Sequence, residues 1–409
     1  MRIGFLFNHD QIHQVAHSLP IALALARTQT DAEIILATTN DRLEAEVARL
    51  AGDRLTGAVS HRRLTLNSPL SKALARVSGA IAPSAKLLVY KDNLDFFRSL
   101  DVLVVAEKTS LVLKSRYGLD HLKIIHTRHG AGDREIGFNP ESARFDHVLV
   151  SGEKVRDRLV RHAGVDPRRI TIVGYPKFDL YGDMPGLGFP DDDRPVVLYN
   201  PHVSPHLSSW YRWGRQILDW FADQDEYRLI FAPHVMLFER PLVVSIDKLR
   251  LARPGGVQKR HLASPNILVD LGSRASTTMA YTNRADIYLG DVSSQVYEFL
   301  LRPRPCVFAD AHRTVWQGDP NYAHWAAGPV FDDVADLGKA LARARKQQGT
   351  IFRPIQEQLF RYSFDLDERP SSERAADVVA RIAGMAERRR PEPFSMLPLR
   401  QPVPQRLVG

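Results

Sequence analysis

The chain has 409 residues, of which 44% are hydrophobic and 25% are charged, and its formal net charge is +8. This length exceeds the roughly 250–300 residues at which a single core stops growing, so we expect two domains. The lone cysteine, Cys306, excludes an internal disulfide, and no apolar run approaches the ~20 residues of a membrane span. The first residues read as a strand and not as a signal peptide, which predicts a cytoplasmic protein.

Runs rich in valine, isoleucine and leucine recur through the first half of the chain. They predict strands at 2–8, 33–38, 101–106, 123–127, 147–151 and 170–174. Amphipathic helical patterns lie between several of them, as at 12–27 and 154–162. Apolar runs that alternate with such helices indicate a parallel sheet covered on both faces.

The stretch from 54 to 91 contains lysine and arginine but no acid, and leucine, alanine and valine are interleaved with the basic residues. One interpretation is an amphipathic segment that contacts an anionic membrane or a lipid-linked anionic acceptor. The other is a plain basic surface helix. No nucleic-acid-binding motif accompanies the charge, so we do not expect nucleic acid as a partner.

A glycine-, proline- and aspartate-rich stretch at 181–195 interrupts the pattern. The alternation then restarts, with strands at 196–200, 228–233, 267–271, 287–290 and 306–309 and helices at 207–222, 296–301 and 371–387. We therefore expect an α/β protein with two Rossmann-like parallel-sheet domains that face a cleft. The expected divisions are an N-terminal domain at 1–182, a linker at 183–195, a C-terminal domain at 196–387 and a basic, proline-rich tail at 388–409.

Ligands of open parallel sheets bind at the carboxyl ends of the strands, so residues that follow strands are the first candidates for a site. His129 and Gly130 directly follow the strand region at 123–127. An imidazole there suits proton abstraction from a hydroxyl near neutral pH, and the small residues after it allow close approach of a substrate. The alternative is a histidine that only forms hydrogen bonds within its loop.

Two histidines of the second half occupy equivalent places. His202 follows the strand at 196–200, and His234 follows the strand at 228–233. Either could contact a donor phosphate, although a loop histidine without a ligand is the alternative for each.

The strongest local pattern is the turn from Gly290 to Ser294, where an apolar strand stops and serines open a helix. Free backbone N–H groups and serine hydroxyls make such a turn an anion site, with Asp291 beside it. Glu298, one helical turn further, could accept hydrogen bonds from ribose hydroxyls. Thr278 lies in a similar, weaker turn. Simple N-capping by Ser293 or Ser294 is the alternative.

Other classes of site lack support in the sequence. His9, His13 and His17 are spaced for one helix face, but no carboxylate or cysteine obviously completes a metal site. The chain also lacks a P-loop, a dinucleotide-binding glycine motif after a strand and the serine elbow of hydrolases. We therefore expect neither a bound metal nor a cofactor.

Several of these residues together resemble the CDP-glycerol glycerophosphotransferase family, the transferases of teichoic-acid-type polymers. The patterns that carry the resemblance are His129-Gly130; Gly174, Pro176, Lys177 and Asp179; Pro233-His234; Asp291, Ser293, Ser294 and Glu298; and the late stretch from Ser371 to Ala376.

The resemblance implies a GT-B fold and transfer of a glycerol-phosphate or related polyol-phosphate group from a CDP-activated donor to a hydroxyl of a glycan or lipid-linked acceptor. It implies His129 as general base, and it implies that His234, Ser293 and Ser294 stabilise charge on the donor phosphates. The residues expected to contact the donor are Gly130, Lys177, His202, Thr278, Asp291, Ser293, Ser294 and Glu298. The alternatives are a nucleotide-sugar glycosyltransferase of the same fold, a UDP-N-acetylglucosamine 2-epimerase-like enzyme and a non-catalytic module that binds anionic polymer.

Overall fold

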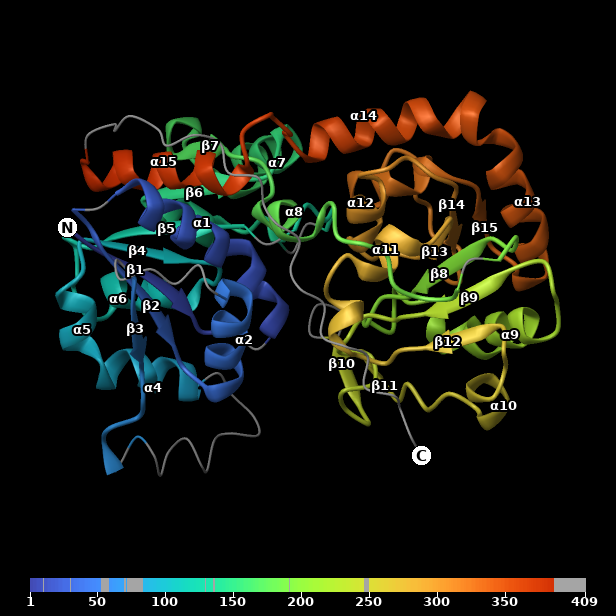
Figure 1. The fold of residues 1–409 in the computed structure, drawn as a ribbon, viewed down its shortest axis with the longest axis horizontal. Coiled ribbons are helices and arrows are strands. Elements are labelled where there is room, and N and C mark those ends of the chain that lie inside the picture. The colour runs from blue at the N-terminus through green and yellow to red at the C-terminus, as the bar shows by residue number, and fades with distance from the viewer. Residues whose placement is uncertain are drawn as a thin grey trace.

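Two parallel β-sheets, each flanked by helices, form the structure (Figure 1). This computed structural model describes residues 1–9, 11–29, 31–52, 59–69, 71, 84–128, 130–134, 137–190, 192–245 and 250–385. The expected fold class, an α/β protein with two parallel-sheet domains, is confirmed. No helix in these ranges is long and apolar enough to cross a membrane.

The first sheet has seven parallel strands in the order β3-β2-β1-β4-β5-β6-β7. Its central strands are buried on both faces, which explains why they read as continuous apolar runs. The strands are β1 (Arg2–Phe7), β2 (Glu33–Thr38), β3 (Val59–Arg63), β4 (Val102–Val105), β5 (Lys123–Thr127), β6 (His147–Val150) and β7 (Ile170–Ile172). The helices of this half are α1 (Val15–Thr28), α2 (Asp41–Ala51), α4 (Ser84–Asp92), α5 (Leu94–Arg98), α6 (Val112–Ser115), α7 (Glu153–Ala163) and α8 (Pro176–Tyr181).

Strand β3 is an element that the sequence did not reveal. It forms the edge of the first sheet and is largely exposed, so its residues are polar and basic and lack an apolar run. Part of the basic stretch 54–91 is therefore a strand. Residues 53–58, 70 and 72–83 of that region lie outside the described ranges.

The second sheet has six parallel strands in the order β12-β9-β8-β13-β14-β15. These strands are β8 (Val196–Asn200), β9 (Arg228–Phe231), β12 (Ile267–Val269), β13 (Ile287–Gly290), β14 (Cys306–Ala309) and β15 (Val330–Phe331), and a separate hairpin pairs β10 (Val243–Ser245) with β11 (Arg250–Ala252). The remaining helices are α9 (Trp210–Ala222), α10 (Lys259–Leu262), α11 (Ala280–Arg284), α12 (Gln295–Phe299), α13 (Leu337–Gln347), α14 (Arg353–Ser363) and α15 (Ser371–Ala383). The sequence predicted no strand at β10, β11 or β15, which contain two or three residues each.

The last helix returns to the first domain. Helix α14 runs back from the second sheet, and α15 packs against α1 and α8 (Figure 1). Its apolar face, which includes Val379, joins the core formed by β1 and α1. The expected division at 196–387 includes this helix, and its apolar contacts lie with helices α1 and α8 of the first half. Residues 386–409, which include the predicted tail, lie outside the described ranges.

A short segment after β7 holds α15 in place. Gly174 has φ 83°, and a Cβ atom there would lie 2.3 Å from the hydroxyl oxygen of Ser371. The carboxylate of Asp179 accepts hydrogen bonds from the backbone N–H groups of Ser371 (3.1 Å) and Ser372 (2.6 Å). Asp179 therefore caps α15 from a distant part of the chain. In this protein the segment from Gly174 to Asp179 works as a helix-docking element.

We predict that Asp179→Ala lowers the free energy of unfolding by about 1–2 kcal/mol, because two N–H groups at the start of α15 lose their acceptor. Asp179→Asn keeps one acceptor oxygen and should lose less. Thermal unfolding of the two variants checks this. Equal midpoints for Asp179→Ala and the unchanged protein would contradict the cap.

Candidate functional site

The turn after β13 is fixed from inside by Asp291. Its buried carboxylate accepts hydrogen bonds from the N–H of His202 (2.8 Å), the N–H of Ser209 (2.7 Å) and the hydroxyl of Ser209 (2.9 Å). A donor contact by Asp291 stays a prediction. The carboxylate faces inward, where backbone N–H and hydroxyl groups donate to it, and it joins the turn to the loop after β8.

The two serines of this turn have different surroundings. Ser293 is buried, whereas Ser294 is exposed at the start of α12. Helix α12 has only five residues, so its dipole is small and the serine hydroxyl and backbone N–H groups remain as the anion donors. Contacts of both serines with a donor stay predictions.

The loop after β5 lies against Ser294. A Cβ atom on Gly132 would come within 3.2 Å of the Ser294 Cβ, so this glycine packs closely against the Ser294 side chain. Gly130 has φ 82°, in the left-handed region that favours glycine. His129 itself lies outside the described residues, and its role as base, like the donor contact of Gly130, stays a prediction. The structure does bring its loop to the predicted phosphate turn.

Cations surround the start of this loop. Arg128 donates to the carbonyl oxygen of Gly137 (2.6 Å), and its guanidinium lies 4.9 Å from the Phe138 ring centre. Burial and the neighbouring Arg158 lower the pKa of Arg128 to about 10, which leaves it charged at neutral pH. Burial, then Arg128, lowers the pKa of Lys108. An anion near this loop would therefore be attracted.

His202 and His234 lie beside each other at the carboxyl ends of β8 and β9, with ring centres 5.8 Å apart. The Nδ1 atom of His202 accepts the N–H of Ser204 (3.0 Å), and that of His234 accepts the N–H of Met236 (3.3 Å). Each neutral ring therefore carries its proton on Nε2. Desolvation lowers the pKa of His234 to about 4, so this ring is a neutral N–H donor at pH 7.

Lys177 and Glu298, both expected to contact the donor, form a buried ion pair with each other. The ammonium of Lys177 lies 2.7 and 2.9 Å from the two carboxylate oxygens, and the hydroxyl of Tyr175 donates to the same group at 3.0 Å. Lys177 is 3% exposed and Glu298 is 7% exposed. This pair joins α8 of the first domain to α12 of the second. Donor contacts by Lys177 and Glu298 stay predictions.

Thr278 is half-buried in the turn before α11, where its hydroxyl donates to the carbonyl oxygen of Ala275 at 3.4 Å. The side chain of Gln295 donates to the carbonyl oxygen of Ser276 at 3.0 Å, which places this turn beside the start of α12. A donor contact by Thr278 stays a prediction.

No sequence pattern predicted the buried ionic cluster that lies where the two domains touch. Asp133 accepts hydrogen bonds from Lys154 (2.8 Å), Tyr297 (2.7 Å) and the Nδ1 atom of His324 (2.8 Å). The other ring nitrogen of His324 faces the carbonyl oxygen of Asp291 at 2.9 Å. These residues are far apart in the sequence and follow no motif, so only their shared three-dimensional position reveals them.

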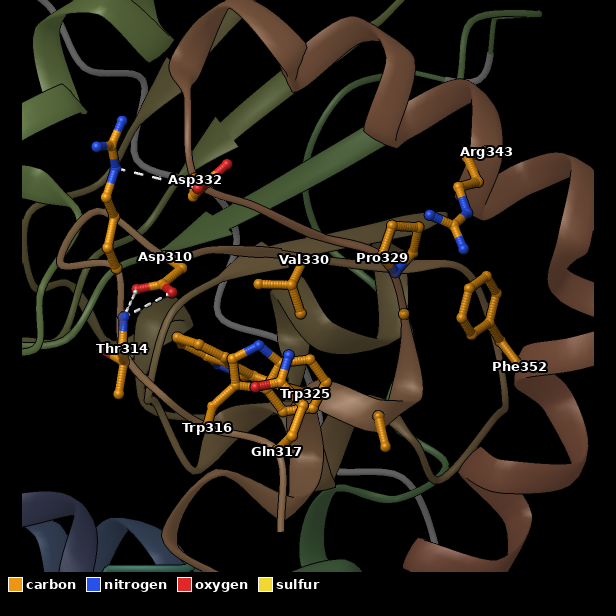
Figure 2. Close-up of a pocket in the computed structure, with 13 residues that line it drawn as sticks. Asp310, Thr314, Trp316, Gln317, Trp325, Pro329, Val330, Asp332, Arg343 and Phe352 are labelled. Atoms are coloured by element: carbon orange, nitrogen blue, oxygen red, sulfur yellow. Dashed lines mark hydrogen bonds and ion pairs between the residues drawn. The ribbon is translucent and has the colours of Figure 1, made fainter. Parts of the chain in front are cut away.

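A cavity of about 540 Å³ opens beside β15. Its walls include Trp316, Gln317 and Trp325, with Arg343 and Phe352 on the other side (Figure 2). Trp325 also donates its indole N–H to the carbonyl oxygen of Asp291 (2.6 Å), so the cavity adjoins the phosphate turn. The indole of Trp316 is half-buried and can contact the face of a sugar ring, and the carboxylate and guanidinium groups around it can contact the hydroxyls of that ring.

The loop that forms one wall of this cavity is under backbone strain. Arg313 has φ 53°, a conformation that side chains rarely adopt. The Asp310 carboxylate holds the loop through the N–H of Thr314 (2.8 Å), and the next residue, Val315, is 86% exposed.

Among the residues that the structure describes, no three histidine, cysteine, aspartate or glutamate side chains gather closely enough to hold a metal ion.

Two parallel-sheet domains with a last helix that returns to the first domain define the GT-B fold, and solved structures share it. The wall teichoic acid polymerase TagF matches with a TM-score of 0.57 at 14% identity, over 94% of this chain and 89% of that one. TagF has also been solved after a soak with CDPG, and that structure matches with a TM-score of 0.58 at 15% identity, over 94% and 88% of the two chains.

Two other structures share the fold. A Listeria monocytogenes protein assigned as a UDP-N-acetylglucosamine 2-epimerase matches with a TM-score of 0.56 at 13% identity, over 97% of this chain and 99% of that one. MnaA of S. aureus bound to UDP matches with a TM-score of 0.55 at 13% identity, over 96% and 100%. At these identities the likeness establishes the fold alone. No protein-family model and no curated protein matches the sequence.

The low pKa of His234 predicts a pH effect on stability. Between pH ~6.5, the ordinary value for histidine, and pH 4, the unfolded chain protonates this ring while the folded chain keeps it neutral. The unfolded state then binds more protons, so its population rises as the pH falls through that window. His234→Gln should therefore lose less thermal stability than the unchanged protein between pH 6.5 and 4.5. The substitution His162→Gln, at an exposed position, serves as control. Identical dependence of the unfolding midpoint on pH in all three proteins would contradict the lowered pKa of His234.

Proposed function

We propose that this protein is a transferase that moves a glycerol-phosphate or related polyol-phosphate group from a CDP-activated donor to a hydroxyl of a glycan or lipid-linked acceptor. One observation carries the proposal: the loop that follows β5 lies against Ser294 at the turn after β13. This contact joins the neighbourhood of the predicted base, His129, to the predicted phosphate turn. His202 and His234 lie at the carboxyl ends of the neighbouring strands of the second sheet.

On the donor side, the proposed contacts are hydroxyl and N–H groups. Ser294 is exposed, and the neutral His234 ring carries its proton on Nε2, so both can donate to phosphate oxygens without a carboxylate competing. A phosphate beside His234 favours the protonated ring, so charge stabilisation can grow as the leaving group becomes more negative. Arg128 adds a positive field from the first domain.

In the proposed reaction, the imidazole of His129 takes the proton of the acceptor hydroxyl as its oxygen attacks the β-phosphorus of the donor. The new bond is a phosphodiester between acceptor and polyol. The bond between that phosphorus and the oxygen bridging to the α-phosphate breaks, and CMP leaves with the electron pair. The donors at the turn after β13 stabilise the charge on the phosphates.

The structural neighbours support a nucleotide-activated donor, since TagF was soaked with CDPG and MnaA was solved with UDP. A nucleotide-sugar glycosyltransferase is the second candidate, because the same base and phosphate contacts would serve attack at an anomeric carbon. A 2-epimerase-like enzyme and a non-catalytic binding module are further candidates that the same assay distinguishes. A cytoplasmic location and contact of the basic stretch 54–91 with an anionic membrane stay predictions.

The donor is tested by nucleotide release from the purified protein offered CDP-glycerol, CDP-ribitol, and UDP- and CMP-sugars. We expect release of CMP from a CDP-polyol in the presence of acceptor. His129→Ala should abolish turnover while CDP binding by calorimetry changes little, because the base contacts the acceptor and not the donor phosphates. His162→Ala, at an exposed position on α7, is the control. Turnover of a nucleotide-sugar alone would rule out the phosphotransferase, and an active His129→Ala variant would rule out the base.

We further propose that the cavity beside β15 holds a sugar ring of the acceptor. Trp316 supplies the flat surface, and Gln317, Asp332 and Arg343 supply polar groups around it. Trp316→Ala should raise the KM for acceptor about tenfold while the KM for donor stays within about twofold, since loss of one stacking contact is worth roughly 1–1.5 kcal/mol. Steady-state kinetics with each substrate varied in turn checks this. An equal rise in both KM values would indicate a general disturbance of the fold.

A further inference from the structure

The carboxylate of Asp133 lies four residues after the predicted base and is almost completely buried. Its donors come from both domains: Lys154 belongs to α7 in the first, whereas Tyr297 belongs to α12 in the second. The third donor, His324, belongs to the 3-10 helix η8 (Pro320–Ala327), also in the second domain. Lys154 and His324 hold the pKa of this carboxyl well below its usual range, against the desolvation that opposes ionisation. Asp133 is therefore an ionised acceptor.

The hydrogen bonds of His324 determine its protonation state. Its Nδ1 atom lies 2.8 Å from a carboxylate oxygen of Asp133, and its Nε2 atom lies 2.9 Å from the carbonyl oxygen of Asp291. An ionised carboxylate and a carbonyl oxygen can only accept hydrogen bonds, so both ring nitrogens must donate. A neutral imidazole has one N–H, so it would set the lone pair of its other nitrogen against one of these acceptor oxygens. A ring that donates from both nitrogens is an imidazolium, and this ring is shielded from solvent at 2% exposure.

Two cations, Lys154 and Arg158, share Asp133 with this ring and oppose a positive charge on it, whereas the Asp133 carboxylate favours that charge. Lys154 faces the same carboxylate, and Arg158 donates to the backbone carbonyl oxygen of Asp133. Tyr297 is a donor to Asp133, and the carboxylate of Asp291 is turned away, toward His202 and Ser209. Asp133 is therefore the carboxylate partner of the imidazolium among the described residues.

We propose that Asp133 and His324 are positioning residues of the transferase, in which the buried imidazolium joins the base-bearing loop to the backbone of the phosphate turn. One end of the ring holds the loop that follows Gly132, and the other holds the carbonyl of Asp291, which is also fixed by the indole N–H of Trp325 (2.6 Å). The pair thereby sets the separation between acceptor base and donor phosphate. This inference depends on the function proposed above.

The first test is kinetic and uses the purified full chain. Asp133→Asn and His324→Gln keep the side-chain size but remove the charged hydrogen bond. Both should lower kcat about 10- to 100-fold with the KM for donor changed less than about threefold, because misplacement of a base affects the chemical step more than donor binding. Asp179→Asn removes a carboxylate at the remote α15 cap and should keep kcat at a temperature well below its unfolding midpoint.

The second test reads the ring directly and needs no substrate. In protein with 15N-labelled histidine rings, one histidine should show both ring nitrogens protonated at pH 7 to 8. This signal should be missing in His324→Gln and should change to a neutral pattern in Asp133→Asn. A neutral His324 at pH 7, or a kcat in Asp133→Asn equal to that of Asp179→Asn, would overturn the inference while leaving the transferase intact. An unchanged protein that turns over no donor would overturn the proposed function, and the positioning role with it.

Discussion

Three buried carboxylates hold the loops of the candidate site, and each imposes the same constraint. An ionised carboxylate without water needs several donors, and its burial is unfavourable if any is removed. Asp133 obtains them from both domains, Glu298 from α8 of the first domain, and Asp291 from the loop after β8. Because each set of donors comes from separate segments, these segments must come together for any one of the charges to be buried.

The chemistry of the phosphate turn depends on this scaffold more than on a helix dipole. Helix α12 is too short to contribute a large field, and the carboxylate oxygens of Asp291 accept hydrogen bonds from the protein's own N–H groups. The groups proposed to face a ligand are the hydroxyl of Ser294 and the neutral ring of His234. Such groups donate hydrogen bonds without a fixed charge, so they suit an anion whose charge shifts between oxygen atoms during a reaction.

The strand pattern in the sequence was enough to predict two parallel sheets, since strands buried on both faces must be apolar throughout. It also located the loops after β5, β8, β9 and β13, because ligand sites follow the carboxyl ends of strands. It could not predict the direction of the side chains. Asp291, Lys177 and Glu298 stand at strand or helix ends as expected, but each turns inward to a partner distant in sequence.

The ionic pair of Asp133 and His324 escaped prediction for the same reason. Asp133 is one acid in a polar loop, and His324 lies in a short 3-10 helix without a motif. The edge strand β3 escaped because one side of it faces solvent and its residues carry no apolar run. A local sequence pattern therefore predicts strands that are buried on both faces. It does not predict an edge strand, or a side-chain contact whose partner is distant in the sequence.

The return of α15 to the first domain has a consequence for how this protein can be divided or recombined. The apolar face of α1 is covered by residues from the far end of the described chain, and Asp179 caps the helix that supplies them. A cut near 183–195 would leave the N-terminal piece with the apolar face of α1 exposed. The C-terminal piece would keep α15 without the helices α1 and α8 on which it packs. A functional exchange of domains between related proteins must therefore move two separate stretches of sequence together, since the first domain is a composite of both.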